Sequence, residues 1–263
     1  MNANIMIFLI GVTLLLFSSI SSLYFDDRRT GNRISNILTL SGSLVLLFYA
    51  IRFVFGKIGA YSIRLSTRLP EPFELSFNIN EIDAIFIAMI SATIITITIL
   101  HSKYDSKTTS YKQNFLTNLL YICIYLIIIN NNLFFYLFLL ECIILLVMFI
   151  LTTKFDSAKN LDNTFMAFNI LQLAFVANAV AFINYQNISG FSEISFYSAN
   201  LVQPVQSSTA FVLYTISVIL ILAIIVTISR SRVFKSQVPI KLKFILTSIL
   251  IPVIIYIFLN IAS

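Results

Sequence analysis

Glu141 is the only charged residue in the 41 positions between Lys112 and Lys154, and its neighbours from Leu133 to Leu151 are mostly aliphatic or aromatic. An ionised carboxylate in the middle of a bilayer costs at least ~2.5 kcal/mol on insertion scales, so it is by default a functional-site hypothesis that needs a partner. Carboxylates in such surroundings are typical of proton relays and ion pathways. The chemistry to look for is therefore proton or cation transfer.

The composition of the chain indicates what surrounds this carboxylate. Of 263 residues, 59% are hydrophobic and 11% are charged, and the mean hydropathy is +0.94. A chain of this length cannot bury so much apolar surface in a soluble core, so it must use lipid as a solvent. The sequence therefore predicts a polytopic membrane protein.

Long apolar runs predict the elements that position Glu141. A helix needs ~20 residues to cross the ~30 Å of hydrocarbon, and the unbroken runs do not alternate in polarity as barrel strands would. The predicted fold class is an all-α, polytopic bundle of about eight transmembrane helices, forming one transmembrane domain over residues 1–263. The expected spans lie near residues 5–23, 35–55, 83–100, 114–130, 133–151, 165–183, 210–228 and 244–262.

Basic residues in alternating loops predict the orientation, because Lys and Arg concentrate on the inner side of a membrane. With eight spans both termini face outside, and the net charge of +6 indicates topology rather than binding to nucleic acid. Four basic residues lie in outer loops (Arg52, Lys57, Arg64 and Arg68), and thirteen lie in inner loops: Arg28, Arg29, Arg33, Lys103, Lys107, Lys112, Lys154, Lys159, Arg230, Arg232, Lys235, Lys241 and Lys243.

Several polar segments have simpler interpretations than chemistry. The outer loop 52–83 ends in an alternating stretch that favours a short hairpin outside the membrane, and 130–132, three asparagines, predicts a tight outer turn. Asn169 and Gln172 are one turn apart on the sixth span. Buried amides of this kind bond neighbouring helices more often than they carry protons. Neither the two cysteines nor the single histidine indicates a metal site.

The basic segment 229–243 offers a partner for Glu141. An apolar helix ends there, and Pro239 prevents its smooth continuation, which would free backbone groups near membrane depth. A lysine in such a site forms an acid–base pair with a buried carboxylate. The alternative, which hydropathy alone favours, is a plain inner loop rich in positive charge.

Taken together, these segments resemble the antiporter-like membrane subunits of respiratory complex I (NADH:ubiquinone oxidoreductase), which are related to Mrp-type cation/proton antiporters. Asn132 to Glu141 looks like the family's fifth helix with its glutamate, and Phe234 to Pro239 is similar to its broken seventh helix, where proline follows a lysine. The segment Pro72–Asp83 resembles the entry to the family's helical core. The resemblance implies that Glu141 and Lys235 form a charge pair that takes part in proton translocation, with Pro239 as the helix break and Lys241, Asn169 and Gln172 as secondary polar candidates.

The chain also departs from the family pattern. Family members have about fourteen helices in two inverted five-helix repeats, and this chain carries one half of that fold. The family's aromatic and histidine after the proline are replaced by Ile240 and Lys241, and its nearby tryptophan by Lys243. The lysine of the family's sixth helix has Met166 as its nearest match, and 244–262 carries no charge.

The resemblance implies a membrane-arm subunit without redox chemistry of its own, most like the amino-terminal half of subunit 2, with subunits 4 and 5 as alternatives. Flavin, iron–sulfur clusters and quinone would belong to partner subunits, and this chain would bind no cofactor. Its partners would be lipids, other complex I membrane subunits and a chain that supplies the missing half. The expected location is the mitochondrial inner membrane, with both termini toward the intermembrane space, or a bacterial inner membrane. Two alternatives stay open: a structural or assembly subunit without pumping, and an independent cation/proton antiporter.

Overall fold

The computed structural model describes residues 3–24, 28–56, 61–65, 75–104, 111–153, 158–189, 208–230 and 245–255. Within these ranges the chain is almost wholly helical, which confirms the predicted fold class. Its elements are, in chain order, α1 (Ala3–Tyr24), α2 (Arg28–Phe55), β1 (Tyr61–Leu65), β2 (Leu75–Ile79), α3 (Glu81–Tyr104), α4 (Tyr111–Ile129), α5 (Leu133–Thr152), α6 (Ala158–Ser189), α8 (Ser208–Arg230) and the π-helix η1 (Leu246–Leu250).

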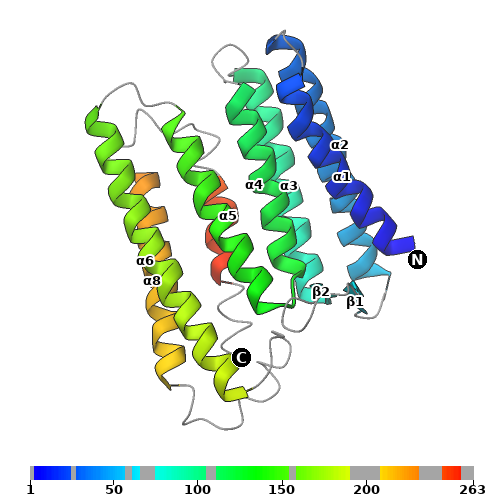
Figure 1. Cartoon of the computed structure of the whole chain (residues 1–263). Coiled ribbons are helices and arrows are strands. Elements are labelled where there is room, and N and C mark those ends of the chain that lie inside the picture. The colour runs from blue at the N-terminus through cyan, green and yellow to red at the C-terminus, as the bar shows by residue number, and fades with distance from the viewer. Residues whose placement is uncertain are drawn as a thin grey trace.

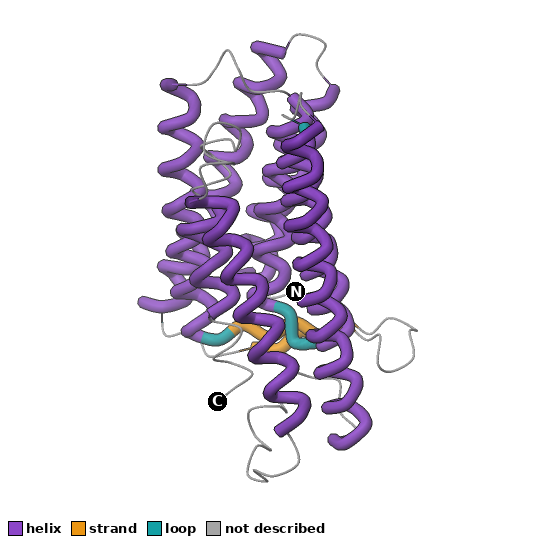
Figure 2. Tube along the Cα trace, turned by 90° about the vertical axis from the view of Figure 1, so that its left-hand side faces the viewer, coloured by secondary structure: helices purple, strands orange, loops and turns teal. Residues whose placement is uncertain are grey.

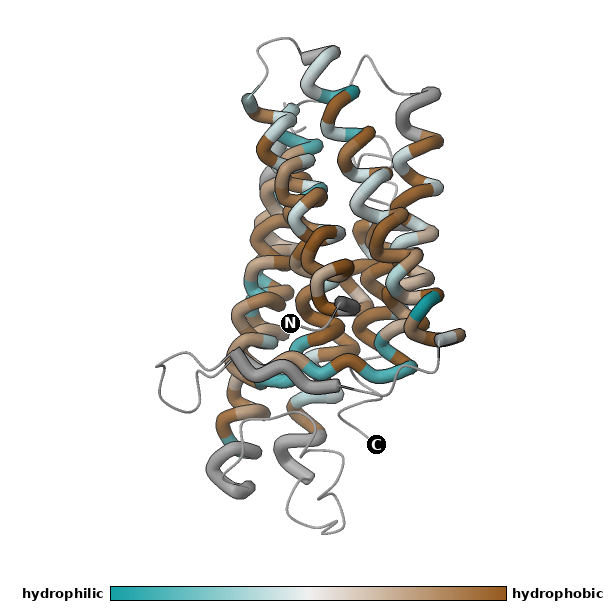
Figure 3. The backbone as a smooth tube through the Cα atoms, turned by 90° about the vertical axis from the view of Figure 1, so that its right-hand side faces the viewer, coloured by the Kyte–Doolittle hydropathy of each residue, from teal (hydrophilic) through white to brown (hydrophobic). Residues whose placement is uncertain are grey.

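Six of the helices, α1 to α6, are long and apolar enough to cross a membrane. The described parts of the two remaining predicted spans are shorter apolar helices, Val212–Ile228 and Leu246–Ile255. The helices stand side by side in one bundle, with α1 to α4 on one side of Figure 1 and α5, α6 and α8 on the other. Figure 3 shows that apolar residues dominate along the bundle, as expected where lipid is the solvent.

Most helices pack against their neighbours in the chain: α1 against α2, α2 against α3, α3 against α4, α4 against α5, α5 against α6 and α6 against α8. Contacts out of chain order join α4 to α1 and α2, and α3 to η1. Among the six candidate spans α4 is the most enclosed, with 67% of its apolar window buried. It therefore forms the centre of the bundle, and α5 with Glu141 lies directly beside it.

The loop between α2 and α3 forms the hairpin that its alternating pattern predicts. β1 and β2 pair antiparallel, with Tyr61 opposite Ile79 and Leu65 opposite Leu75, and the pair lies across one end of the bundle in Figure 2. Phe77 of β2 forms a further bridge to Asn130, in the turn before α5. We call this end of the bundle the hairpin end.

Side-chain caps fix where the helices begin at the hairpin end. At the start of α3, the Asn80 backbone N–H donates to Asp83 Oδ2 and the Asp83 N–H donates to Asn80 Oδ1, each over 2.9 Å. At the start of α5, Asn132 Oδ1 accepts from the backbone N–H groups of Phe134 (2.9 Å) and Phe135 (3.0 Å). These bonds satisfy N–H groups that a helix start otherwise leaves unpaired, so the three asparagines do form the predicted turn.

Glycine and serine let α1, α2 and α4 approach closely. A Cβ atom at Gly42 would lie 3.0 Å from the Gly11 carbonyl oxygen, so α1 and α2 are in backbone contact there. Small residues allow this kind of contact between membrane helices. Nearer the end opposite the hairpin, Asn118 Nδ2 donates to Ser18 Oγ (2.8 Å) and Ser35 Oγ (3.0 Å), and the Ser18 hydroxyl lies 2.6 Å from that of Thr39.

Candidate functional site

The candidate site is built around Glu141, in the middle of α5. On one side Glu141 contacts α6. On the other side lie three exposed apolar side chains of α5 itself, Phe138, Leu145 and Phe149. The Glu141 side chain is half-buried. The carboxylate therefore sits at the margin of the bundle interior, at the contact between α5 and α6.

Gln172 of α6 is the hydrogen-bond partner that the described residues supply. Its Nε2 donates to Glu141 Oε1 over 2.8 Å. The other carboxylate oxygen, Oε2, is buried and accepts no hydrogen bond from the part of the chain that the structure describes. A carboxylate with one bonded and one unbonded buried oxygen is only half compensated for its removal from water.

The two secondary amides on α6 have different surroundings. Gln172 faces α5 and bonds Glu141, whereas Asn169 is exposed on the outer surface of the helix. Met166, the nearest match to the family's lysine, is also on the outer surface, with 66% of its area exposed. Only Gln172 of these three positions contributes to the site.

The structure does not describe the segment that contains the basic partner predicted for Glu141. Lys235, Pro239, Ile240, Lys241 and Lys243 fall outside the described residues, which end at Arg230 and resume at Ile245. The pairing of Glu141 with Lys235 and the helix break at Pro239 therefore stay predictions.

A second polar cluster lies between Glu141 and the hairpin end, and none of its residues is among the site residues that the sequence predicts. We define this tyrosine–asparagine cluster as Tyr136 of α5, Asn178 of α6, and Tyr214 and Ser217 of α8. All four side chains are buried. The Tyr136 hydroxyl faces the Asn178 amide and the Tyr214 hydroxyl, and the ring of Phe182 packs against both tyrosines, with centroids 5.4 Å and 5.6 Å away.

Three polar atoms of Asn178 and Ser217 lack hydrogen bonds of ordinary geometry with the described residues. Neither Asn178 Nδ2, Asn178 Oδ1 nor Ser217 Oγ makes one with any described residue, although Asn178 is close enough to the Tyr136 hydroxyl to interact with it. A polar residue on the buried face of an apolar span is the signal that marks such a position in sequence. Asn178, with apolar residues from Leu173 to Ala177 and from Ala179 to Ile183 around it, carries that signal.

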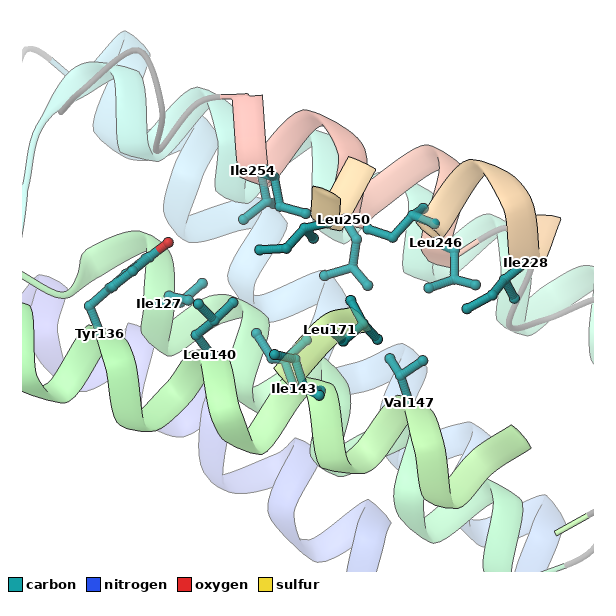
Figure 4. Close-up of a pocket in the computed structure, with 14 residues that line it drawn as sticks. Ile127, Tyr136, Leu140, Ile143, Val147, Leu171, Ile228, Leu246, Leu250 and Ile254 are labelled. Carbon is teal, nitrogen blue, oxygen red and sulfur yellow. The ribbon is translucent and has the colours of Figure 1, made fainter. Parts of the chain in front are cut away.

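An apolar cavity of about 40 Å³ lies among α5, α6, α8 and η1. By size it could hold more than one water molecule, but a cavity lined by aliphatic groups stays dry. Tyr136 supplies the only hydroxyl among its lining residues, which otherwise are Ile, Leu and Val. Figure 4 shows these side chains reaching into the gap from α5 and from the α8 and η1 segments opposite it. Aliphatic side chains line the cavity between α5 and η1, among them Leu140 and Ile143 of α5 and Leu250 of η1.

No metal-binding group is formed by the described residues, since no three His, Cys, Asp or Glu side chains gather there. Cys123 and Cys142 are both free. What the described site offers is a carboxylate in an apolar span, the type of group that marks ion pathways in membrane proteins.

Comparisons with known proteins bear on the fold. No protein-family model matches the sequence, and no curated protein matches it either. Among solved structures, a chain of the membrane-bound sulfane sulfur reductase, an archaeal respiratory membrane complex, superposes with a TM-score of 0.70 at 12% identity, over 96% of this chain and 40% of that one. A chain of the Mrp complex from Dietzia sp. DQ12-45-1b superposes with a TM-score of 0.68 at 13% identity, over 99% of this chain and 49% of that one.

At these identities the similarity concerns the fold alone. This chain spans less than half the length of either solved chain, and both solved chains belong to multi-subunit membrane complexes. The protein therefore shares the helical fold of these two solved chains, and six of its described helices are long and apolar enough to cross a membrane.

Proposed function

We propose that this chain is a subunit of a membrane-bound respiratory assembly, in which Glu141 takes part in proton or cation translocation and a second chain completes the fold. Within that class we propose the membrane arm of NADH:ubiquinone oxidoreductase, on the motif resemblance around Glu141 and Lys235. The chain itself would carry out no redox step, and flavin, iron–sulfur clusters and quinone would be bound by partner subunits.

The observation that carries the proposal is the state of Glu141. A membrane-embedded carboxylate has one oxygen bonded to Gln172 and the other buried without a partner among the described residues. A purely structural position would favour a neutral residue, because even a paired charge is costly in hydrocarbon. The free-energy cost of placing a carboxylate in hydrocarbon is explained if the carboxylate exchanges protons during translocation.

The apolar cavity beside α5 is compatible with the proposal. It shows that the contact between α5, α8 and η1 is aliphatic among the described lining residues, so protons have no hydrated path through it. The described polar groups around Glu141 lie instead along α6, at Gln172 and Asn178. We infer that the α5–α6 contact is where a translocation step involving Glu141 would occur.

For orientation we propose that the hairpin end faces the intermembrane space or the periplasm. The support is the count of basic residues in alternating loops, since Lys and Arg concentrate on the inner side. The loop that contains the hairpin is one of those assigned to the outer side by that count. A protease or impermeant label applied to sealed vesicles of known sidedness would test the assignment.

The test of function is the substitution Glu141→Gln in the native membrane. The amide keeps the shape of the side chain and cannot release a proton, so we expect proton or cation movement to fall about tenfold or more, with assembly unchanged. Movement would be followed by a pH-sensitive dye in sealed vesicles, with and without an electron donor. The control is Glu81→Gln, the same change at an exposed position at the start of α3.

Each alternative gives a different result in this assay. Unchanged movement in Glu141→Gln, together with disturbed assembly in Glu141→Arg, would support a structural or assembly subunit. Ion movement by the purified chain in liposomes without any electron donor would support an independent cation/proton antiporter.

A further inference from the structure

The outer face of α6 carries a polar side chain within an apolar surface. Asn169 is exposed there, and α6 lies at the edge of the bundle in Figure 1. Exposed apolar residues of the same helix precede and follow it at alternating intervals of three and four positions, so they all share one face. We call these residues the Asn169 strip: Met166, Asn169, Leu173, Val176, Val180 and Ile183.

Asn169 differs from other exposed polar side chains inside the described spans. The Thr13 hydroxyl of α1 donates to the Ile10 carbonyl, and the Thr96 hydroxyl of α3 donates to the Ala92 carbonyl, each over 2.9 Å. These threonines therefore satisfy their hydroxyls within their own helices. The Asn169 side chain makes no hydrogen bond to any described residue, so its amide needs a partner from outside the described part of the chain.

The depth of Asn169 excludes the lipid headgroups as that partner. Asp162 lies on the same face of α6, seven residues earlier, and is also exposed. At 1.5 Å of rise per residue, Asn169 lies roughly 10 Å further into the span than this charged residue, and an asparagine side chain is too short to reach back over that distance. Acyl chains offer no hydrogen bond, whereas amides in membrane spans bond neighbouring helices.

We propose that the Asn169 strip is the docking surface for a transmembrane helix of another subunit, which brings an amide or hydroxyl side chain to the depth of Asn169. An asparagine amide both donates and accepts, so it fits Asn, Gln, Ser or Thr on the partner helix. The intervals of three and four residues along the strip are those along which two membrane helices pack.

The polar residue, and not the apolar strip, identifies this surface. Every lipid-facing helix exposes apolar residues at helical intervals, and acyl chains cover such residues equally well. An acyl chain would leave the Asn169 amide unpaired. A second copy of this chain would pair two Asn169 amides with each other, whereas the proposed assembly calls for a different chain. The inference rests on the proposed function for the presence of other subunits, and it requires no proton transfer at Glu141.

The chain supplies a matched control on α1. Thr13 and Phe17 have the same spacing as Asn169 and Leu173, and Phe17 and Leu173 each expose 61% of their area. The Thr13 hydroxyl already has its hydrogen bond. The two positions therefore differ in whether the neighbouring polar side chain needs a partner from outside the described chain.

The experiment is site-specific photo-crosslinking in the native membrane, with p-benzoylphenylalanine in place of Met166, Leu173 or Phe17, one position at a time. Mass spectrometry of the crosslinked peptides gives the position of each adduct. We expect the adducts from Met166 and Leu173 to lie in one apolar segment of one other subunit, on either side of a single Asn, Gln, Ser or Thr. The yield of protein adducts at Leu173 should be several times the yield at Phe17.

The variant Asn169→Leu removes the amide at nearly constant volume and removes no described contact within the chain, so we expect it to fold. The yield at Leu173 should fall about threefold or more, the factor expected for one hydrogen bond between membrane helices. Asn169→Gln keeps an amide on the same face and should retain most of the yield.

Four results would overturn the proposal: lipid adducts alone from Met166 and Leu173, adducts to a second copy of this chain, adducts that do not flank a common polar residue, or an unchanged yield in Asn169→Leu. The failure of this inference is distinct from that of the proposed function. Flanking adducts together with normal ion movement in Glu141→Gln would keep the docking surface and remove the role of Glu141. Lipid adducts alone together with lost ion movement would do the reverse.

Discussion

Glu141 shows how one residue's surroundings decide between a structural and a chemical role. Its hydrogen bond from Gln172 orients the carboxylate along α6, and its second oxygen remains free among the described residues. A half-satisfied buried polar group is less stable than a fully satisfied one, and this is the observation on which the proposed role of Glu141 in translocation rests.

We predict that Gln172→Leu destabilises the protein, while the neighbouring change Asn169→Leu does not. A hydrogen bond between membrane helices is worth ~0.6 kcal/mol on average and at most ~1.7 kcal/mol, and leucine leaves Glu141 Oε1 without its donor. Asn169 is exposed, so its replacement removes no described contact. The thermal midpoint of the purified protein in detergent measures both variants. Equal midpoints would contradict the importance of the Gln172 bond.

At the scale of elements, caps and polar contacts define the ends and pairings of the helices. Asn132 starts α5 with two accepted hydrogen bonds, and the contact of Asn118 with Ser18 and Ser35 joins α4 to α1 and α2. Hydrogen bonds between membrane helices average only ~0.6 kcal/mol in double-mutant cycles. Their effect is therefore to specify which helices pair, while apolar packing contributes most of the stability.

The π-helix η1 has a local cause. Pro252 follows directly after Leu250 and Ile251, and it has no backbone N–H to donate. The Ile251 N–H reaches back to the Leu246 carbonyl, five residues earlier. A wider turn of this kind is the usual way for a helix to absorb such an interruption.

We expect Asn132→Ala to destabilise the protein by ~0.5–2 kcal/mol, the usual cost of losing an N-cap. The first turn of α5 would then fray, and the helix would hold the Glu141 side chain less firmly against α6. Asn132→Asp keeps an oxygen in place, and aspartate caps as well as asparagine does. Chemical denaturation in mixed micelles would give the difference. Equal losses in both variants would show that the cap is not the cause.

At the scale of the whole molecule, the chain covers less than half the length of the solved chains that share its fold, and its described surface is strongly apolar. It spans 40% and 49% of the two solved chains that share its fold. On the described surface, Phe138, Met166 and Leu173 expose 60% or more of their area. Lipid or a partner chain must cover these side chains, and Asn169 on the same face of α6 would gain a hydrogen bond only from a partner.

We predict that the chain migrates in native membranes as part of a complex much heavier than its own 29.8 kDa. Solubilisation in mild detergent, native electrophoresis and mass spectrometry would identify its neighbours. Flavin and iron–sulfur proteins among them, with a second antiporter-like chain, would support the proposed assembly. Isolation as a free homo-oligomer would contradict it.

The sequence was sufficient for the features that depend on local chemistry and on the solvent. Apolar runs must form helices in lipid, because only helices satisfy their own backbone there, and the described helices follow those runs. The hairpin and the Asn130–Asn132 turn follow from alternation and from asparagine's side-chain bonds.

Only the tertiary structure decided which polar groups meet. Asn169 and Gln172 are three residues apart, which turns them about 60° from one another on a helix of 3.6 residues per turn. Because α6 meets α5 along one edge, this angle is enough to place Gln172 against Glu141 and to leave Asn169 on the exposed surface of α6. Tyr136, Asn178 and Tyr214 converge from three helices, because packing brings together residues that no sequence spacing relates.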